Sequence, residues 1–380
     1  FSLFFPEKRE FFLENAGFFT FGEGVGVRRR RGGRTDLIPF FSRRIGVSGG
    51  SLVPILGGAR LTGRAGAFTL GVLGMQSDDF DEEPSTNFSV VRVRRDLMDN
   101  SNMGVLFVNK EGGNHFNRTY GVDGNFNFLR YLNLTSFLLK TETPGLSGND
   151  GAGKFEMGWQ DPFWLVRAGF LSIEENFNPE VGYVRRGGYD RGERGGDAVR
   201  KGDGEFGVAF RPEDRIPWIR EIQPSVQPEY ITDQDNLLLT RDIEKQVLVE
   251  FNDSSRLAIR HDSTFERLDE PFEITDTQTI PLGDYGFNST RISFRGNESR
   301  KLSFDFDYTT GGFFNGELDS YEVELLMQPS YRFRTNLVWE HNNVSLPDGD
   351  FSTNLVGADI QYGFSTTMFI NALIQYNSED

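Results

Sequence analysis

Alternation of apolar and polar side chains is the feature that most restricts how this chain folds. In one segment, Leu302, Phe304, Phe306 and Tyr308 alternate with Lys301, Ser303, Asp305 and Asp307. Successive side chains of a β-strand point to opposite faces, so one face is apolar and the other charged. The pattern recurs and predicts strands near residues 52–63, 66–76, 86–96, 102–110, 117–128, 131–141, 153–160, 163–173, 204–211, 218–231, 237–251, 255–266, 285–296, 300–309, 320–328, 330–341, 353–363 and 366–377.

Such alternation fits both a soluble β-sandwich and a transmembrane β-barrel. The predicted strands are near ten residues long and follow one another without helices. Aromatic residues such as Trp159 and Trp339 gather near their ends, as in the girdles of membrane barrels. The 380 residues include 37 Phe, yet only 37% are hydrophobic, which suits an apolar belt on one face. We therefore predict an all-β fold, a transmembrane antiparallel up-and-down β-barrel in the bacterial outer membrane.

Connection lengths refine the topology. Short turns alternate with longer connections, predicted at 77–86, 143–151, 173–203, 267–284, 311–319 and 341–351. Membrane barrels have short periplasmic turns and long outer loops. If the turn at 63–66 is periplasmic, Leu37–Val47 must climb to the outer side, either as a first strand or as a pass through the lumen. The same parity places at least one closing strand beyond Asp380, which gives about 20 strands in a range of roughly 16–22.

Residues 1–50 do not alternate, and we predict them as a plug or linker segment before a barrel at 51–380 that lacks its last strand or strands. Residues 4–17 predict a short helix that begins at Pro6 and ends at Gly17. Two interpretations remain open, a plug inside the lumen and a periplasmic linker. The charged residues of a plug would be Glu7, Lys8, Arg9, Glu10, Glu14, Arg43 and Arg44.

Four ordered blocks resemble a known family. They are Phe5-Pro-Glu-Lys-Arg-Glu-Phe-Phe-Leu-Glu-Asn, Phe41-Ser-Arg-Arg-Ile-Gly, Gly57-Gly-Ala-Arg-Leu-Thr-Gly-Arg and Phe177-Asn-Pro-Glu-Val-Gly-Tyr-Val-Arg-Arg. They are similar to the uncharacterised outer-membrane β-barrel domain that follows a periplasmic domain like family 9 carbohydrate-binding modules. The resemblance implies outer-membrane lipid and such a periplasmic domain as partners. It implies no established activity and no sugar site in this chain.

Charges on the polar faces of the predicted strands mark a lumen wall. Neighbouring strands bring opposite charges together there, which would set selectivity or fasten a plug. The predicted wall residues are Arg92, Arg94, Arg256, Arg260, Arg332, Arg334, Asp305, Asp307, Glu322 and Glu324. The connection 173–203 is long enough to suggest a role, and Glu180, Arg185 and Arg186 are its candidate constriction residues. The alternative is a mobile surface loop.

Other chemistry has weaker support. Gly46-Val47-Ser48-Gly49-Gly50 matches G-x-S-x-G but precedes a predicted strand rather than a helix, which favours a loop. The three His are scattered, and the chain has no Cys, so we predict neither a metal site nor a cofactor. Asp78, Asp79 and Asp81 are weak outer-loop candidates for cation binding, against the alternative of a solvated loop. A formal charge of −16 argues against nucleic acid.

The expected function is passage or handling of solute across the outer membrane, with a link to carbohydrate drawn from the resemblance. One alternative is a plugged, non-conducting barrel that anchors a periplasmic or surface partner. A second alternative is a membrane-embedded hydrolase, since a triad is recognised by geometry rather than by sequence order. The sequence identifies neither the solute nor the oligomeric state.

Overall fold

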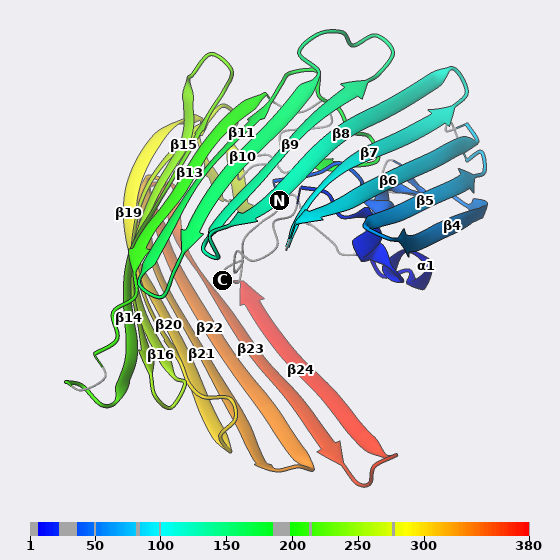
Figure 1. Cartoon of the computed structure of the whole chain (residues 1–380). Coiled ribbons are helices and arrows are strands. Elements are labelled where there is room, and N and C mark those ends of the chain that lie inside the picture. Colours follow the sequence, from blue (N-terminus) through cyan, green and yellow to red (C-terminus); the bar gives the residue numbers. More distant parts are fainter. Residues whose placement is uncertain are drawn as a thin grey trace. The chain divides into compact units, whose positions relative to one another are not determined.

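The structure is a computed structural model. It describes residues 7–22, 36–48, 51–80, 84–98, 100–184, 198–212, 215–275 and 278–379. Among these residues, 18 long strands, drawn as arrows in Figure 1, pair in one antiparallel sheet. The order of pairing is that of a closed up-and-down barrel. This confirms the predicted fold class, and 18 lies within the predicted range. None of the described helices has the length and hydropathy needed to cross a membrane.

The long strands follow the chain closely as predicted. They are β4 (Ile55–Ala65), β5 (Phe68–Ser77), β6 (Thr86–Met98), β7 (Ser101–Gly112), β8 (His115–Phe128), β9 (Leu132–Glu142), β10 (Gly151–Gln160), β11 (Trp164–Ile173), β13 (Val199–Val208), β14 (Ile219–Thr232), β15 (Leu238–Phe251), β16 (Arg256–Leu268), β19 (Gly283–Arg295), β20 (Leu302–Phe313), β21 (Gly316–Ser330), β22 (Phe333–Leu346), β23 (Gly349–Gly363) and β24 (Phe369–Glu379). Each predicted strand corresponds to one of them.

Short elements complete the described chain. The helices are α1 (Glu10–Leu13) and the 3-10 turns η1 (Ala16–Phe19) and η2 (Ser42–Arg44). Three small two-stranded sheets join β1 (Leu37–Ile38) to β12 (Tyr183–Val184), β2 (Val47–Ser48) to β3 (Ser51–Leu52), and β17 (Phe272–Thr275) to β18 (Gln278–Ile280).

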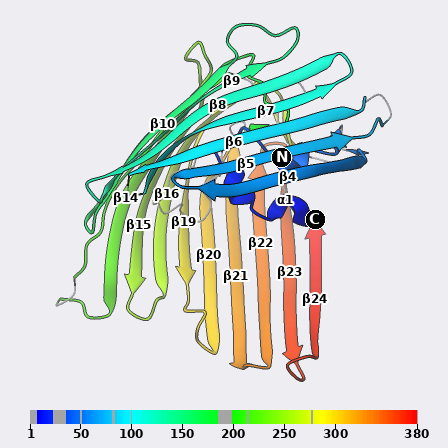
Figure 2. The same ribbon diagram turned by 45° about the vertical axis from the view of Figure 1, so that its right-hand side comes forward.

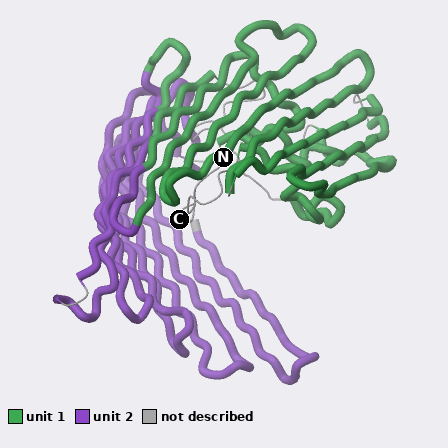
Figure 3. Tube along the Cα trace, viewed as in Figure 1, with its two compact units in different colours: residues 1–161, 167–203, 231–237 green, residues 162–166, 204–230, 238–380 purple. Residues whose placement is uncertain are grey.

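The chain divides into two compact units (Figure 3). Unit 1 comprises residues 1–161, 167–203 and 231–237, and unit 2 comprises 162–166, 204–230 and 238–380. In unit 1, each strand from β4 to β10 pairs with the next one along the chain. In unit 2, β15, β16 and β19 to β24 do the same, and β20 to β24 lie side by side in Figure 2.

Register separates two faces in unit 2. Directly paired positions put their side chains on the same face of a sheet. One row is apolar and runs Val249, Leu257, Phe294, Phe306, Val323, Trp339 and Val356. The adjacent row on the other face runs Leu248, Ala258, Ser293, Asp307, Glu322 and Glu340. We call these the apolar face and the charged face.

Unit 1 also exposes an apolar face. Its register aligns Leu70, Val93, Val105, Val122 and Leu138 across five strands. Of these, Val105 and Val122 are each 50% exposed and Leu138 is 65% exposed. Large exposed aliphatic side chains in register mark a surface that meets something other than water.

Two predicted long connections are wrong. Strands β20 and β21 extend to a two-residue turn at Phe314 and Asn315, so 311–319 is mostly strand. Strands β22 and β23 likewise extend to a turn at Pro347 and Asp348, so 341–351 is also mostly strand. The backbone ladder continues through Gly and Asn positions there because each pairs directly with a residue of the neighbouring strand.

The N-terminal predictions also need correction. Leu37–Val47 is not a first barrel strand, because Leu37 and Ile38 pair with Val184 and Tyr183 and Val47 pairs with Leu52 in a short hairpin. The predicted helix over 4–17 is reduced to the single turn α1, and Gly17 lies inside η1 rather than ending a helix. Pro6 lies outside the described residues.

Candidate functional site

Residues 7–22 and 36–48 pack onto one face of the unit 1 sheet, which we call the covered face. Phe12, Phe19 and Ile45 join the strand residues in one buried apolar cluster. The strand members are Leu73 and Met75 on β5, Phe88 and Val90 on β6, and Leu106 and Val108 on β7, with Val181 from the loop after β11. The covered face therefore carries apolar side chains as well as charged ones, because the segment buries them. Glycine makes room for this packing, since a Cβ at Gly71 would lie 3.0 Å from the Phe19 ring.

A buried ion pair fixes the end of this segment. The Arg92 guanidinium donates two hydrogen bonds to the Asp123 carboxylate at 2.6 and 2.7 Å, and their side chains are only 2% and 8% exposed. Arg92 Nε also donates to the Thr20 carbonyl at 3.0 Å, and the Gly22 amide donates to Asp123 Oδ2 at 3.0 Å. The guanidinium lies over the Phe21 ring, 5.2 Å from its centroid. The pair therefore holds residues 20–22 by both of its members.

A second network orders the start of the segment. Arg9 pairs with Glu7 at 2.7 Å and donates to the carbonyls of Ile45 and Ser42, each at 2.8 Å. Burial alone would raise the pKa of Glu7, but hydrogen bonds from Arg9 and Ser42 and the Arg9 charge lower it to about 2. This network ties residues 7–9 to 42–45. Nearby, Arg60 of β4 pairs with Glu14 at 2.7 Å.

Residues 174–184, which we call the strap, bind both the sheet and the N-terminal segment. Phe41 donates its amide hydrogen to the Val181 carbonyl at 2.7 Å, and Arg44 Nε donates to the Gly182 carbonyl at 3.2 Å. On the sheet side, Glu180 accepts a hydrogen bond from Lys110 at 2.8 Å and lies 2.8 Å from His115 Nε2. The blocks beginning at Phe41 and Phe177 are thus brought into contact.

The predicted plug residues are therefore divided in their contacts. Glu7, Arg9, Glu14 and Arg44 make the contacts described above, whereas Lys8 and Glu10 are exposed. Arg43 lies in η2. Glu180 lies in the strap, where it contacts Lys110 and His115 of the sheet, and Arg185 and Arg186 lie outside the described residues. Asp123 and Arg60 were missed by the sequence analysis, although Asp123 lies on the polar side of an alternating strand.

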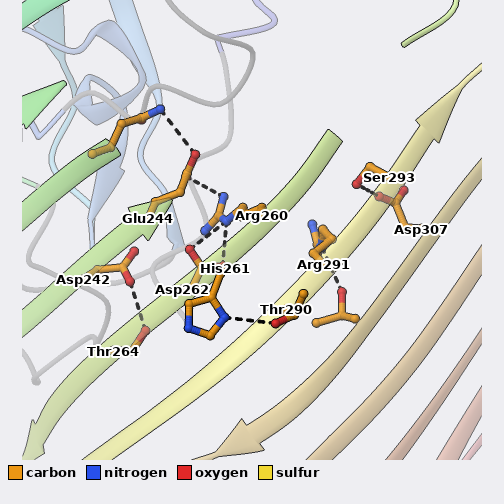
Figure 4. Close-up of polar contacts among 12 residues, drawn as sticks. Asp242, Glu244, Arg260, His261, Asp262, Thr264, Thr290, Arg291, Ser293 and Asp307 are labelled. Carbon is orange, nitrogen blue, oxygen red and sulfur yellow. Dashed lines mark hydrogen bonds and ion pairs between the residues drawn. The ribbon is translucent and has the colours of Figure 1, made fainter. Parts of the chain in front are cut away.

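Charges of the unit 2 charged face pair across strands (Figure 4). Arg260 pairs with Glu244 at 2.9 Å and with Asp262 at 2.7 Å. Arg295 pairs with Asp305 at 3.5 Å and with Asp307. The predicted wall residues Arg260, Asp305 and Asp307 thus take part in ion pairs, which join β16 to β15 and β20 to β19.

Other predicted wall residues behave differently. Arg256 pairs with Glu250 at 3.0 Å, and Glu324 accepts a hydrogen bond from Asn336 at 2.6 Å. Arg332 lies in the turn between β21 and β22, where its Nε donates to the Tyr331 hydroxyl at 3.0 Å, so it is not on the wall. Arg334 is exposed on β22, and the Nε of Arg94 is buried without a hydrogen-bond partner.

The hairpin β17–β18 is a further feature that sequence reasoning missed. It lies in the connection after β16, and Phe272 packs 5.9 Å from the ring of Phe314. Tyr285 and Phe287 of β19 contact the same ring at 5.5 and 5.4 Å. Phe314 is 8% exposed with φ of 51° in the β20–β21 turn. This aromatic cluster anchors the hairpin at one end of the unit 2 sheet.

The candidate metal ligands form no cluster in the described part of the chain. No group of three or more His, Asp or Glu side chains is placed there to hold a metal ion. Asp78 accepts a hydrogen bond from the Asp79 amide, and Asp81 lies outside the described residues. Ser48 lies in β2, which leads into β3 rather than a helix. The ring nitrogens of His115, His261 and His341 contact Glu180, Thr290 and Asn354, respectively.

Comparison with known proteins adds similar solved structures. The chain is similar to Acinetobacter baumannii OccAB3, with 10% identity, a TM-score of 0.40, and coverage of 81% of this chain and 92% of that one. It is also similar to Pseudomonas aeruginosa OccK9 (OpdG), with 9% identity, a TM-score of 0.36, and coverage of 84% and 95%. No family model and no curated protein matches the chain. At these scores the fold assignment rests on the strand pairing itself.

Breaking the buried pair is expected to release residues 7–22. In R92L or D123N, one buried polar partner is left unpaired, which costs about 3–5 kcal/mol. Amide hydrogen exchange of residues 7–22, measured in detergent by mass spectrometry, should rise strongly. The control D150N removes an acid whose oxygen lies 3.4 Å from Lys140 in the same unit and should exchange like the wild type. Equal exchange in all variants would contradict the role of the pair.

Acid is expected to loosen the strap. Burial alone would raise the pKa of Glu180, but hydrogen bonds and charges of Lys110 and His115 lower it. A lowered folded pKa means that this stabilisation is present above the ordinary Glu value of about 4.3 and is lost as the pH falls through the folded value. Protease accessibility of residues 174–184 should therefore increase in acid.

The variant E180Q tests this assignment. It should make the strap accessible at neutral pH and remove the acid dependence, because the amide carries no charge to titrate. E142Q is the control, since Glu142 lies 3.8 Å from Arg118 and does not touch the strap. An unchanged acid transition in E180Q would assign the titration to another group.

Proposed function

We propose that this chain is an outer-membrane β-barrel through which solute passes, with residues 7–22 and 36–48 partly filling its lumen. The observation that carries the proposal is the separation of an apolar and a charged face by strand register. An apolar outer belt suits lipid, and a charged lining suits an aqueous path.

The dimensions of the apolar face support a membrane span. On β22, outward positions run from Phe333 to His341, eight residue steps or about 27 Å along the strand. At a tilt of about 40° this covers roughly 20 Å, close to the ~25 Å apolar band of membrane barrels. Aromatic pairs edge the belt. Tyr308 and Tyr321 stack at 4.8 Å between centroids at one edge, and Tyr362 and Phe364 contact at 4.8 Å at the other.

Two neighbouring substitutions test the membrane span. L337R places a charge on the apolar face and should cost about 2–4 kcal/mol of folding free energy in a bilayer. N336R places the same charge on the charged face beside Glu324 and should cost little. Urea titration of folding into phosphatidylcholine vesicles measures both. Equal stability of the two variants would count against a lipid-facing Leu337.

Unbalanced carboxylates favour cation passage. Asp307, Glu322 and Glu340 lie directly opposite one another on three adjacent strands, and Arg295 pairs with Asp307 alone among them. Within the described chain, neither Glu322 nor Glu340 has a cationic partner within 4 Å. Like charges held in register raise the local concentration of counter-ions. The carboxylates would therefore make the path prefer cations.

Reversal-potential measurements in planar bilayers test this preference. E322Q should lower the cation-to-anion permeability ratio roughly twofold, because it removes a charge from the path. E317Q is the matched control, since Glu317 lies on the same strand with the opposite parity. If E322Q and E317Q have the same cation-to-anion permeability ratio, Glu322 does not line the path.

A plugged barrel that conducts nothing is the second candidate, and the buried Arg92–Asp123 pair favours it. Conductance of the whole chain, of a form without residues 1–50 and of R92L separates the two. Conductance that rises in both variants supports passage with a plug. If none of the three proteins conducts, the non-conducting anchor is the better account. We further propose, from the four sequence blocks alone, a carbohydrate link and a periplasmic carbohydrate-binding-like domain as partner.

A further inference from the structure

Cationic side chains lie just beyond the apolar belt on the outward side of β15 and β16. Along β15 the outward positions run Val249, Val247, Lys245, Ile243 and Arg241. Register pairs Val247 with Ile259, Lys245 with His261, and Arg241 with Phe265. We propose that Arg241, Lys245, His261 and Phe265, here named the cationic patch, bind the phosphate of an anionic membrane lipid.

The two cations of the patch form no ion pair with the described residues of the chain. In the described residues, neither Lys245 nor Arg241 has a carboxylate within 4 Å, and Arg241 Nε is buried without a hydrogen-bond partner. Arg267 nearby differs, because Asp284 accepts two hydrogen bonds from it at 2.6 and 2.7 Å. Two cations without acidic partners on one face provide donors for an external anion.

Neighbouring side chains shape the patch. The Arg241 and Arg267 guanidinium carbons each lie 6.0 Å from the centroid of the Phe265 ring. The ring keeps Arg241 against the wall through a cation–π contact. His261 Nδ1 lies 3.0 Å from Thr290 Oγ1 (Figure 4), which sets the orientation of the imidazole. Register places this imidazole directly opposite Lys245.

The position of the patch selects a lipid over a soluble anion. Lys245 is two residues beyond Val247, about 7 Å along the strand, which is the depth of headgroups over an apolar belt. Below it, Val247 and Ile259 are 43% and 48% exposed. A ligand with a phosphate and acyl chains contacts both surfaces at once, whereas free phosphate contacts only the first. This inference rests on the membrane location proposed above, but not on conductance.

Native mass spectrometry of the full chain in detergent tests the proposal, with diphosphoryl lipid A as the probe. R241Q/K245Q should bind it roughly thirty-fold more weakly, because each cation near an anionic surface contributes about a factor of five. The matched control R118Q/K140Q removes two outward cations at the same end of β8 and β9. These already lie near acids, with Arg118 3.8 Å from Glu142 and Lys140 3.4 Å from Asp150. It should bind the probe like the wild type.

Two further arms identify the ligand group. Fully dephosphorylated lipid A should bind the wild type as weakly as lipid A binds R241Q/K245Q, and inorganic phosphate should not compete at equal concentration. Equal loss in the control variant, or binding that does not depend on the lipid phosphate, overturns the proposal. Competition by inorganic phosphate would assign the patch to a soluble anion and also overturn it. Circular dichroism verifies that each variant is folded, and conductance tests the proposed function separately.

Discussion

Backbone pairing in register is the constraint on which the rest of this structure depends. A strand has a side-chain period of two, so a slip by one residue would exchange its two faces. In unit 2 such a slip would move Asp307 and Glu322 into the row of Phe306 and Val323. An apolar environment cannot solvate these carboxylates, and exposing the aromatic rings to water is unfavourable. The apolar and charged faces therefore fix the register, and the register in turn decides which charges meet.

The N-terminal segment changes this rule in unit 1. There, the covered face carries Val90 and Leu106, which would be misplaced in an aqueous path but are buried by Phe12, Phe19 and Ile45. Burial makes every remaining charge costly, so Arg92 is paired with Asp123 and hydrogen-bonded to the segment itself. The apolar contacts bury the surface between the segment and the sheet, and the ion pair fixes where residues 20–22 lie.

The positions and faces of the 18 long strands were predictable from the sequence because alternation is a local signal repeated in each strand. The total of about 20 was not, since Leu37–Val47 supplies no barrel strand. The turns at Phe314 and Pro347 were not, since Gly311, Gly312 and Asn342 suggest loops when read without their partner strands. Glu7, Arg9 and Glu180 were recognised as candidates by type and segment. Their partners, Ser42 for Glu7 and Lys110 for Glu180, lie 35 and 70 positions away, and only the fold brings them together.

Charge has three different roles in this chain, and burial separates them. Where side chains are covered, as at Arg92, pairing is obligatory and fixes a segment in place. Where they line the charged face, as at Glu322, no cation lies within 4 Å in the described chain, and we propose that counter-ions in the path balance the carboxylate. Where they lie beside an apolar belt, as at Lys245, we propose that the phosphate of a membrane lipid is the counter-ion. The environment of a charged residue therefore decides its role. A covered residue holds a segment in place, whereas we propose that one on the charged face influences ion passage and that one beside the apolar belt binds lipid.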